Sequence, residues 1–157
     1  MRKLSFMLIT IMIMILILAV VPAAASSPPL DVVIEVEENL APYPPAPFVA
    51  SGPAVSEGLI CQEGGTTDDW VRVNGAQSQQ VRTLQVLKRF VCNDGSGEFF
   101  VMLQVRFDRT GEYNTIFQWV IVGGNGDYEN LHGSGSGVGV PANGGYDVLD
   151  IYEGQIH

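Results

Sequence analysis

Residues 116–139 read IFQWVIVGGNGDYENLHGSGSGVG, and this stretch decides the fold. Its first seven residues are mostly β-branched and aromatic, a composition that favours a strand. The glycines at 123, 124 and 126 then predict a turn, because glycine adopts backbone conformations that other residues avoid. Residues 128–132 predict a second extended run, and glycine recurs at every second position from 133 to 139. We therefore expect a hairpin within a larger sheet.

Similar extended runs flank this hairpin and are separated by short turns rich in glycine and asparagine. The expected strands cover residues 58–62, 69–73, 81–93, 98–108, 113–122 and 146–156. The expected turns lie at residues 64–67, 74–75, 93–97, 109–111 and 141–145. No segment keeps a helical spacing of apolar residues over the length that a helix needs. The pattern predicts an all-β antiparallel domain, either a barrel or a β-sandwich.

The first 25 residues have the layout of a secretory signal peptide. Arg2 and Lys3 precede an almost wholly apolar run at residues 4–21, and an A-x-A pattern follows Pro22. An uncleaved membrane anchor is the alternative, since about 18 apolar residues can just span a bilayer. The helix-breaking Pro22 and the small residues after it favour cleavage before Ser26. We therefore expect a secreted or extracytoplasmic protein without stable membrane insertion.

Residues 26–57 differ in composition from the rest of the chain. They contain seven prolines, and residues 41–47 read APYPPAP. Because proline fixes φ and donates no backbone hydrogen bond, this segment is expected to be a flexible arm or linker. Within it, residues 31–37 have the composition of a short strand. The β-barrel domain is then expected to cover residues 58–157.

The mature chain is strongly acidic and contains two cysteines. Without the leader, six basic residues stand against 17 acidic ones, a formal charge of −11. Such a chain is repelled by nucleic acid, so nucleic-acid binding is not expected. Cys61 and Cys92 form an even pair in an exported chain, which predicts a disulfide bond. Two thiolates and two scattered histidines are a poor ligand set for zinc, so neither a metal site nor a cofactor is expected.

Side chains alternate between two faces along a strand, and two arrangements of these faces fit the sequence. In residues 98–108 and 116–122 one face is wholly apolar and the other is mixed. In the first arrangement the apolar faces form the core and the mixed faces meet solvent. In the second, the mixed faces line the barrel lumen and bind a ligand. The ligand-binding candidates are then Met102, Gln104, Arg106 and Gln118, with Lys88 or Arg89 nearby.

The central hairpin resembles that of one known family. Residues 117–128, with the pattern F-x-W-x-I-x-G-G-N-G-D-Y, and residues 131–135, LHGSG, resemble the G-T-G-x-[FY] hairpin of allene oxide cyclase-like barrels and plant dirigent proteins. Asn125 stands where the family usually has threonine. The resemblance implies an eight-stranded closed antiparallel barrel, often oligomeric, whose apolar lumen holds a small hydrophobic molecule. The hairpin glycines are the only positions of the family that can be matched to this chain, and the role that the resemblance implies for them is structural: Gly124, Gly126, Gly133 and Gly135.

Other chemistries find little support in the sequence. No G-x-S-x-G motif is present, and acidic residues such as Asp147 and Asp150 lie near expected strand ends, where solvated acids are common.

The expected function is binding of a small apolar or phenolic molecule. One alternative is an allene oxide cyclase-like isomerase, in which Arg106 or a carboxylate in the lumen steers charge. The other is an extracellular structural or adhesion domain that forms oligomers.

Overall fold

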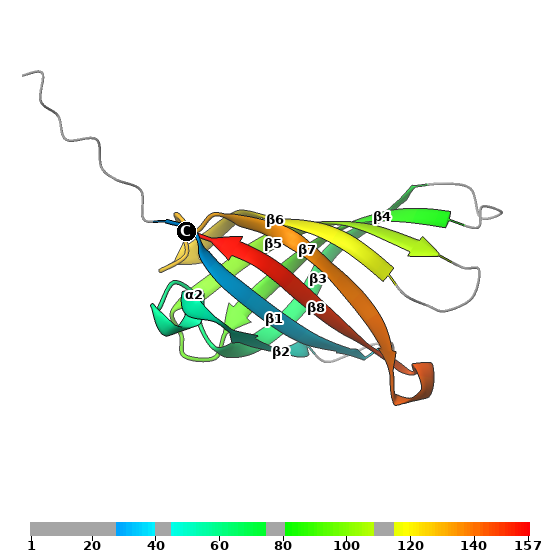
Figure 1. Ribbon diagram of the computed structural model, residues 1–157, viewed down its shortest axis with the longest axis horizontal. Coiled ribbons are helices and arrows are strands. Elements are labelled where there is room, and N and C mark those ends of the chain that lie inside the picture. Colours follow the sequence, from blue (N-terminus) through cyan, green and yellow to red (C-terminus); the bar gives the residue numbers. More distant parts are fainter. Residues whose placement is uncertain (1–27, 40–44, 75–80, 109–114) are drawn as a thin grey trace, which may run out of the picture.

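The structure is a computed structural model that describes residues 28–39, 45–74, 81–108 and 115–157. The elements are β1 (Leu30–Asn39), β2 (Ala46–Ser51), α2 (Pro53–Ser56), β3 (Glu63–Asn74), β4 (Val81–Cys92), β5 (Gly97–Asp108), β6 (Thr115–Gly126), β7 (Gly133–Ala142), the 3-10 turn η1 (Asn143–Gly145) and β8 (Asp147–Ile156). The eight strands pair in sequence order, and β8 returns to β1 to close an antiparallel barrel (Figure 1). The prediction of an eight-stranded closed barrel is therefore confirmed.

The barrel begins well before residue 58, so the prediction of an arm at residues 26–57 is wrong for the described part of that segment. β1 pairs with β8 over ten residues, and β2 joins β1 to β3. The prolines lie outside β1, whose inward side chains Val32, Ile34 and Val36 are buried. Pro47 lies on the exposed face of β2. The signal peptide expected at residues 1–25 lies outside the described residues, and within the described ranges no helix has the length and hydropathy of a membrane span.

Two further boundaries differ from the prediction. Residues 58–62 form a loop, and β3 starts at Glu63, so the glycines at 64 and 65 lie in a strand instead of a turn. A Cβ at Gly64 would overlap the Phe48 ring and the Val91 carbonyl, so close packing explains this glycine. At the other hairpin, β6 extends to Gly126 and residues 127–130 are the turn. Tyr128 is buried in that turn rather than part of an extended run.

One end of the barrel is closed by the loop between β2 and β3, which contains α2 (Figure 1). Ala54 and Ile60 of this loop are buried. Tyr128 reaches the same loop, and its hydroxyl accepts a hydrogen bond from the Cys61 backbone N–H at 3.1 Å. Cys61 is also linked to Cys92, at the end of β4, through an S–S bond of 1.99 Å. The predicted disulfide is therefore confirmed, and it fastens the closing loop to the wall of the barrel.

A layer of aromatic side chains fills the middle of the barrel. The Phe90 and Phe99 rings stack with their centroids 4.9 Å apart. Tyr152 meets Phe90 edge-on at 5.9 Å and packs against Phe117 at 4.7 Å. These four side chains are at most 5% exposed. The aromatic layer therefore separates the closed end of the barrel from the other end.

β7 makes room for this layer because every second residue is glycine. A Cβ at Gly137 would overlap the Phe117 ring, and a Cβ at Gly135 would lie 2.8 Å from the Trp119 ring. Gly133 and Gly124 are restricted in the same way, by Ile156 and Tyr128. Gly126 is also restricted by its φ of 67°, which lies in the left-handed region that favours glycine, and a Cβ there would overlap the Ser96 carbonyl. Close packing thus restricts all four glycines that the resemblance singled out.

Removing the disulfide is expected to lower the free energy of unfolding by roughly 3–4 kcal/mol, since the bond closes a loop between residues 31 positions apart. Urea denaturation of a Cys61→Ala/Cys92→Ala double variant would measure the loss. Reducing the wild-type protein should produce the same loss and leave the variant unchanged. Equal stability of the variant and the oxidised wild type would contradict the prediction.

Candidate functional site

The end of the barrel opposite α2 contains an open cavity of about 760 Å³, which we call the cup. Apolar side chains of β4, β5 and β6 form its walls, and η1 lies at its mouth. The wall side chains are Leu84, Val86, Leu103, Val105, Phe107 and Phe117. Pockets of 300–1,000 Å³ typically hold small organic molecules. The cup is therefore large enough for a ligand.

Strand alternation positions the walls of the cup. On β5, Phe99, Val101, Leu103 and Val105 face inward in turn. Phe99 and Val101 are at most 1% exposed, Leu103 is 3% exposed, and Val105 is only partly buried. Inward side chains therefore fill the barrel in its middle but line an open space near this end.

A buried cation lies in the cup. Lys88 is 4% exposed, and its ammonium group forms ion pairs with Glu38 of β1 and, at 2.8 Å, with Asp68 of β3. Burial alone would lower the pKa of Lys88, but the two carboxylates outweigh it and raise the pKa above its ordinary value. Lys88 therefore stays charged inside the barrel.

The adjacent residue, Arg89, lies on the outer surface. Its guanidinium donates a hydrogen bond of 2.7 Å to Asp69, the neighbour of Asp68. Alternation along β3 and β4 thus gives one ion-paired group inside the barrel and one outside. The expectation that Lys88 or Arg89 lies near the lumen is right for Lys88 and wrong for Arg89.

Asp150 is a second ionisable group inside the cup. Burial raises its pKa to about 7, and the charges of Glu38 and Asp68 act in the same direction while Lys88 opposes them. Among the described residues, none forms a hydrogen bond or an ion pair with the Asp150 carboxylate. The expectation that Asp150 is a solvated acid at a strand end is therefore wrong. Its charge changes near neutral pH.

Two buried hydroxyl groups near these charges lack a hydrogen-bond partner among the described residues: those of Tyr152 and Thr66. Tyr152 occupies the inward position next to Asp150 on β8. Burial raises the pKa of Tyr152 well above its ordinary value, and the charges of Asp150, Glu38 and Asp68 raise it further. The Tyr152 hydroxyl therefore lies within electrostatic reach of all three carboxylates.

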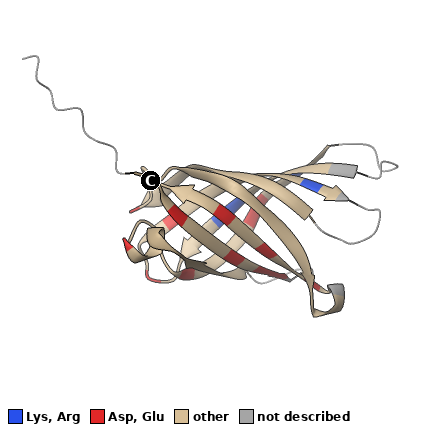
Figure 2. Cartoon of the chain, in the orientation of Figure 1, with Lys and Arg blue, Asp and Glu red and all other residues tan. Residues whose placement is uncertain are grey.

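The described polar lining of the cup is acidic. It contains four carboxyl groups and one ammonium group: Glu38, Asp68, Asp147, Asp150 and Lys88. Acidic residues also follow β1 and β8 on the outer surface (Figure 2). Within the parts of the chain that the structure describes, no three histidine, cysteine or acidic side chains are arranged to hold a metal ion.

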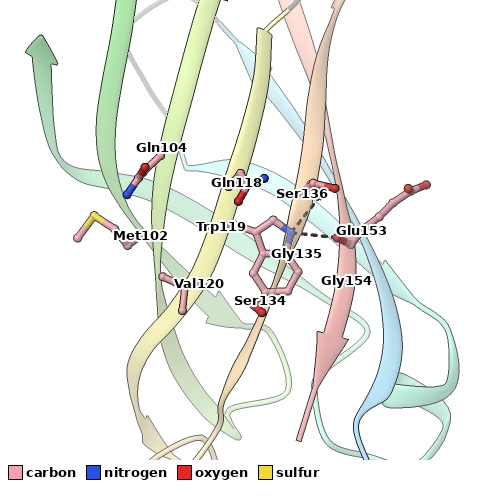
Figure 3. Close-up of a pocket in the computed structure, with 10 residues that line it drawn as sticks. All are labelled: Met102, Gln104, Gln118, Trp119, Val120, Ser134, Gly135, Ser136, Glu153 and Gly154. Atoms are coloured by element: carbon pink, nitrogen blue, oxygen red, sulfur yellow. Dashed lines mark hydrogen bonds between the residues drawn. The ribbon is translucent and has the colours of Figure 1, made fainter.

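The four residues predicted to bind a ligand lie on the outer surface of the barrel. Gln104 pairs with Gln118 across β5 and β6, and both line a surface groove of about 650 Å³ together with Met102 (Figure 3). Arg106 is exposed on the same face of β5. The prediction that these side chains line the lumen is wrong, because the wholly apolar faces turn inward, as in the first arrangement. Ligand binding in the outer groove stays a prediction.

Sequence reasoning missed Glu38 and Asp68 of the cup and interpreted Asp150 as a solvated acid, although a signal was present. The inward row of β1 reads Val32, Ile34, Val36, Glu38, so an acidic residue ends an apolar row. The proline content predicted an arm at residues 26–57, and an arm has no inward face. On β8, Asp150 shares its face with the buried Tyr152. An acidic residue that follows buried apolar residues on the same face of a strand therefore indicates a carboxylate inside the barrel.

The fold and the cup define a class of protein: a small closed antiparallel barrel, filled at one end and open at the other. No family model matches the chain, and no curated protein or solved structure is similar enough to count as a match. Kinship with the allene oxide cyclase-like family therefore stays a prediction.

Proposed function

We propose that the protein binds a small, largely apolar molecule in the cup. The observation that supports this most directly is the open cavity of about 760 Å³ with apolar walls. Burial of apolar surface contributes roughly 25 cal/mol per Å². A ligand that fills the cup removes its own surface and that of the walls from water, which favours binding. The packed aromatic layer forms the floor of the cup.

We also propose that the protein works outside the cytoplasm. The leader at residues 1–25 and the Cys61–Cys92 disulfide support this location. Exposed apolar side chains of β6 and β7, among them Val120, Val138 and Val140, support the expectation of a homo-oligomer. Native mass spectrometry of the protein from a secreting host would report the first residue, the oligomer and any ligand retained.

A bulky side chain placed in the cavity tests whether the cup binds the ligand. Val105→Trp places an indole in the cavity, where it is expected to weaken binding of the neutral apolar dye N-phenyl-1-naphthylamine about tenfold or more. Fluorescence titration measures the dissociation constant. Gln104→Trp is the matched control, because Gln104 is the preceding residue on the same strand and faces the outer groove. It is expected to change the dissociation constant less than about twofold.

The opposite result would reassign the site. If Gln104→Trp prevents dye binding and Val105→Trp leaves it intact, the outer groove is the binding site and the cup is not. If the wild-type protein binds no apolar dye, the proposed function is wrong. Far-UV circular dichroism of both variants ensures that a loss of binding does not reflect a loss of fold.

Isomerisation of a bound molecule is a second candidate function, and Asp150 is the observation that favours it. A carboxyl group with a pKa of about 7 inside a cavity is suited to donate and recover a proton near neutral pH. The sequence predicts that Arg106 or a carboxylate in the lumen steers charge in such an isomerase; Arg106 lies outside the cup, and Asp150 is a carboxylate within it. Turnover of an unsaturated epoxide that is lost in Asp150→Asn, with dye binding retained, would support catalysis over simple binding.

A further inference from the structure

We propose that the ligand of the cup carries a positively charged amino group on an apolar body, and that this amino group binds at Asp150. The inference rests on the proposed function, because the apolar walls hold the body of the same ligand. It adds the chemical class of the head group.

The charges of the described lining favour a cation. Lys88 compensates only one of its two partners, Glu38 and Asp68, and Asp147 adds a further carboxylate at the mouth. When Asp150 is ionised, four carboxylates therefore stand against one ammonium group. Charges in an apolar cavity are screened less than charges in bulk water. The excess of negative charge in the cup therefore acts strongly on the head group of a ligand. The cup should attract an amine and repel a carboxylate or a phosphate.

Asp150 differs from the other inner carboxylates because no described residue pairs with it. Glu38 and Asp68 already hold the ammonium group of Lys88. The raised pKa of Asp150, about 7, reflects burial that the charge of Lys88 offsets only in part. A ligand ammonium group would supply that partner through a charge-assisted hydrogen bond.

The Tyr152 hydroxyl is an independent sign of a missing polar partner. It is buried, its side chain is 1% exposed, and it has no hydrogen-bond partner among the described residues. Buried hydroxyl groups are usually hydrogen-bonded. Tyr152 shares the inward face of β8 with Asp150 and feels the charges of the inner carboxylates. An ammonium group has three donor hydrogens, so one bound at Asp150 has further donors for other acceptors of the cup.

Binding of an amine should depend on pH in a defined direction. Among the described residues, the charged and titratable groups near Asp150 are Glu38 from β1, Asp68 from β3, Lys88 from β4, and Asp147 and Tyr152 from β8. Of these inner groups, Asp150 is the one with a pKa of about 7. An ammonium group prefers the ionised carboxylate, so affinity for an amine should rise as the pH rises through about 7.

Three probes of similar shape test the head group: decylamine, decanol and decanoate. At pH 8 we expect decylamine to bind about tenfold or more tightly than decanol, and decanoate to bind most weakly. Displacement of N-phenyl-1-naphthylamine from the full-length protein measures all three. Lowering the pH to 5.5 should reduce the preference for decylamine, because Asp150 then holds a proton.

A pair of matched variants assigns the preference to Asp150. Asp150→Asn is expected to bring decylamine to within about threefold of decanol at every pH. Asp69→Asn removes the same charge from the outer surface, where Asp69 pairs with Arg89, and should have no effect. A wild-type protein that binds decanol as tightly as decylamine, or decanoate more tightly than either, overturns the inference and leaves the proposed function standing. If the dye binds but none of the three probes displaces it, the inference fails, and if the dye itself does not bind, the proposed function fails as well.

Discussion

Replacing Lys88 with methionine is expected to lower the free energy of unfolding by about 3–5 kcal/mol. Methionine retains the apolar stem but removes the ammonium group that Glu38 and Asp68 share inside the barrel. Both carboxylates would then lie near Asp150 with no cation between them. Urea denaturation at pH 8 measures the loss, which should become smaller at acidic pH as the carboxylates take up protons.

Arg89→Met provides the matched control for this prediction. Arg89 is the next residue on β4, and it forms its ion pair with Asp69 on the outer surface. Exposed ion pairs add little to stability, so this variant should unfold at nearly the wild-type urea concentration. Equal losses in the free energy of unfolding would contradict the prediction, because they would show that the Lys88 ion pairs stabilise the barrel no more than the exposed Arg89 pair does.

Asp150→Asn is expected to stabilise the protein at pH 8. The carboxyl group has a pKa of about 7 in the folded chain and about 3.9 in an unfolded chain, and this difference corresponds to at most roughly 4 kcal/mol. Asparagine has a similar shape and no charge, so it avoids the cost of burying the carboxylate. The free energy of unfolding at pH 8 should therefore rise, but by less than this limit, because a buried asparagine amide without a partner also costs free energy.

The sign of this effect depends on pH. Below about pH 3.9 Asp150 is protonated in both states and its titration contributes nothing. Between about pH 3.9 and 7 the unfolded chain loses this proton while the folded chain keeps it, so the wild-type free energy of unfolding falls as the pH rises. Above about pH 7 the cost is constant. The gain from Asp150→Asn should therefore appear across this interval and level off above it.

Glu153→Gln is the control for Asp150→Asn, because Glu153 is exposed on the outer face of the same strand. It should not reproduce the gain at pH 8. A destabilising effect of Asp150→Asn at pH 8 would show that the Asp150 carboxylate is well solvated or paired in the folded protein. The expected gain in stability, together with the expected loss of amine preference, would identify Asp150 as a residue retained for binding at the expense of stability.

Much of the barrel could be predicted from local patterns in the sequence. The runs at 81–93 and 98–108 correspond to β4 and β5 almost residue for residue, since alternation and β-branched residues are local properties. The disulfide followed from the cysteine count. The wholly apolar face of β5 indicated the core, and Leu103, with its neighbours on that face, turns inward.

The parts that failed depend on contacts distant in sequence. Proline content suggested an arm, but β1 is held by its pairing with β8, more than 100 residues away. Gly64 suggested a turn, but it lies in a strand. Only glycine fits there, because the Phe48 ring of β2 and the Val91 carbonyl of β4 leave no room for a Cβ. The sequence predicted a ligand site on the mixed faces, with Lys88 or Arg89 nearby, and only the closed barrel shows that the charges of Lys88 and Asp150 meet on the apolar side.

The pairing of β1 with β8 has a consequence for the order of folding. Leu30 pairs with Ile156, so the seam cannot form until the ribosome has made almost all of the segment between them. A nascent chain that lacks β8 presents two unpaired strand edges, β1 and β7, and such edges invite association with other chains. Folding dominated by long-range strand pairing is also slow. Newly made chains are therefore expected to be most prone to aggregation before β8 pairs with β1.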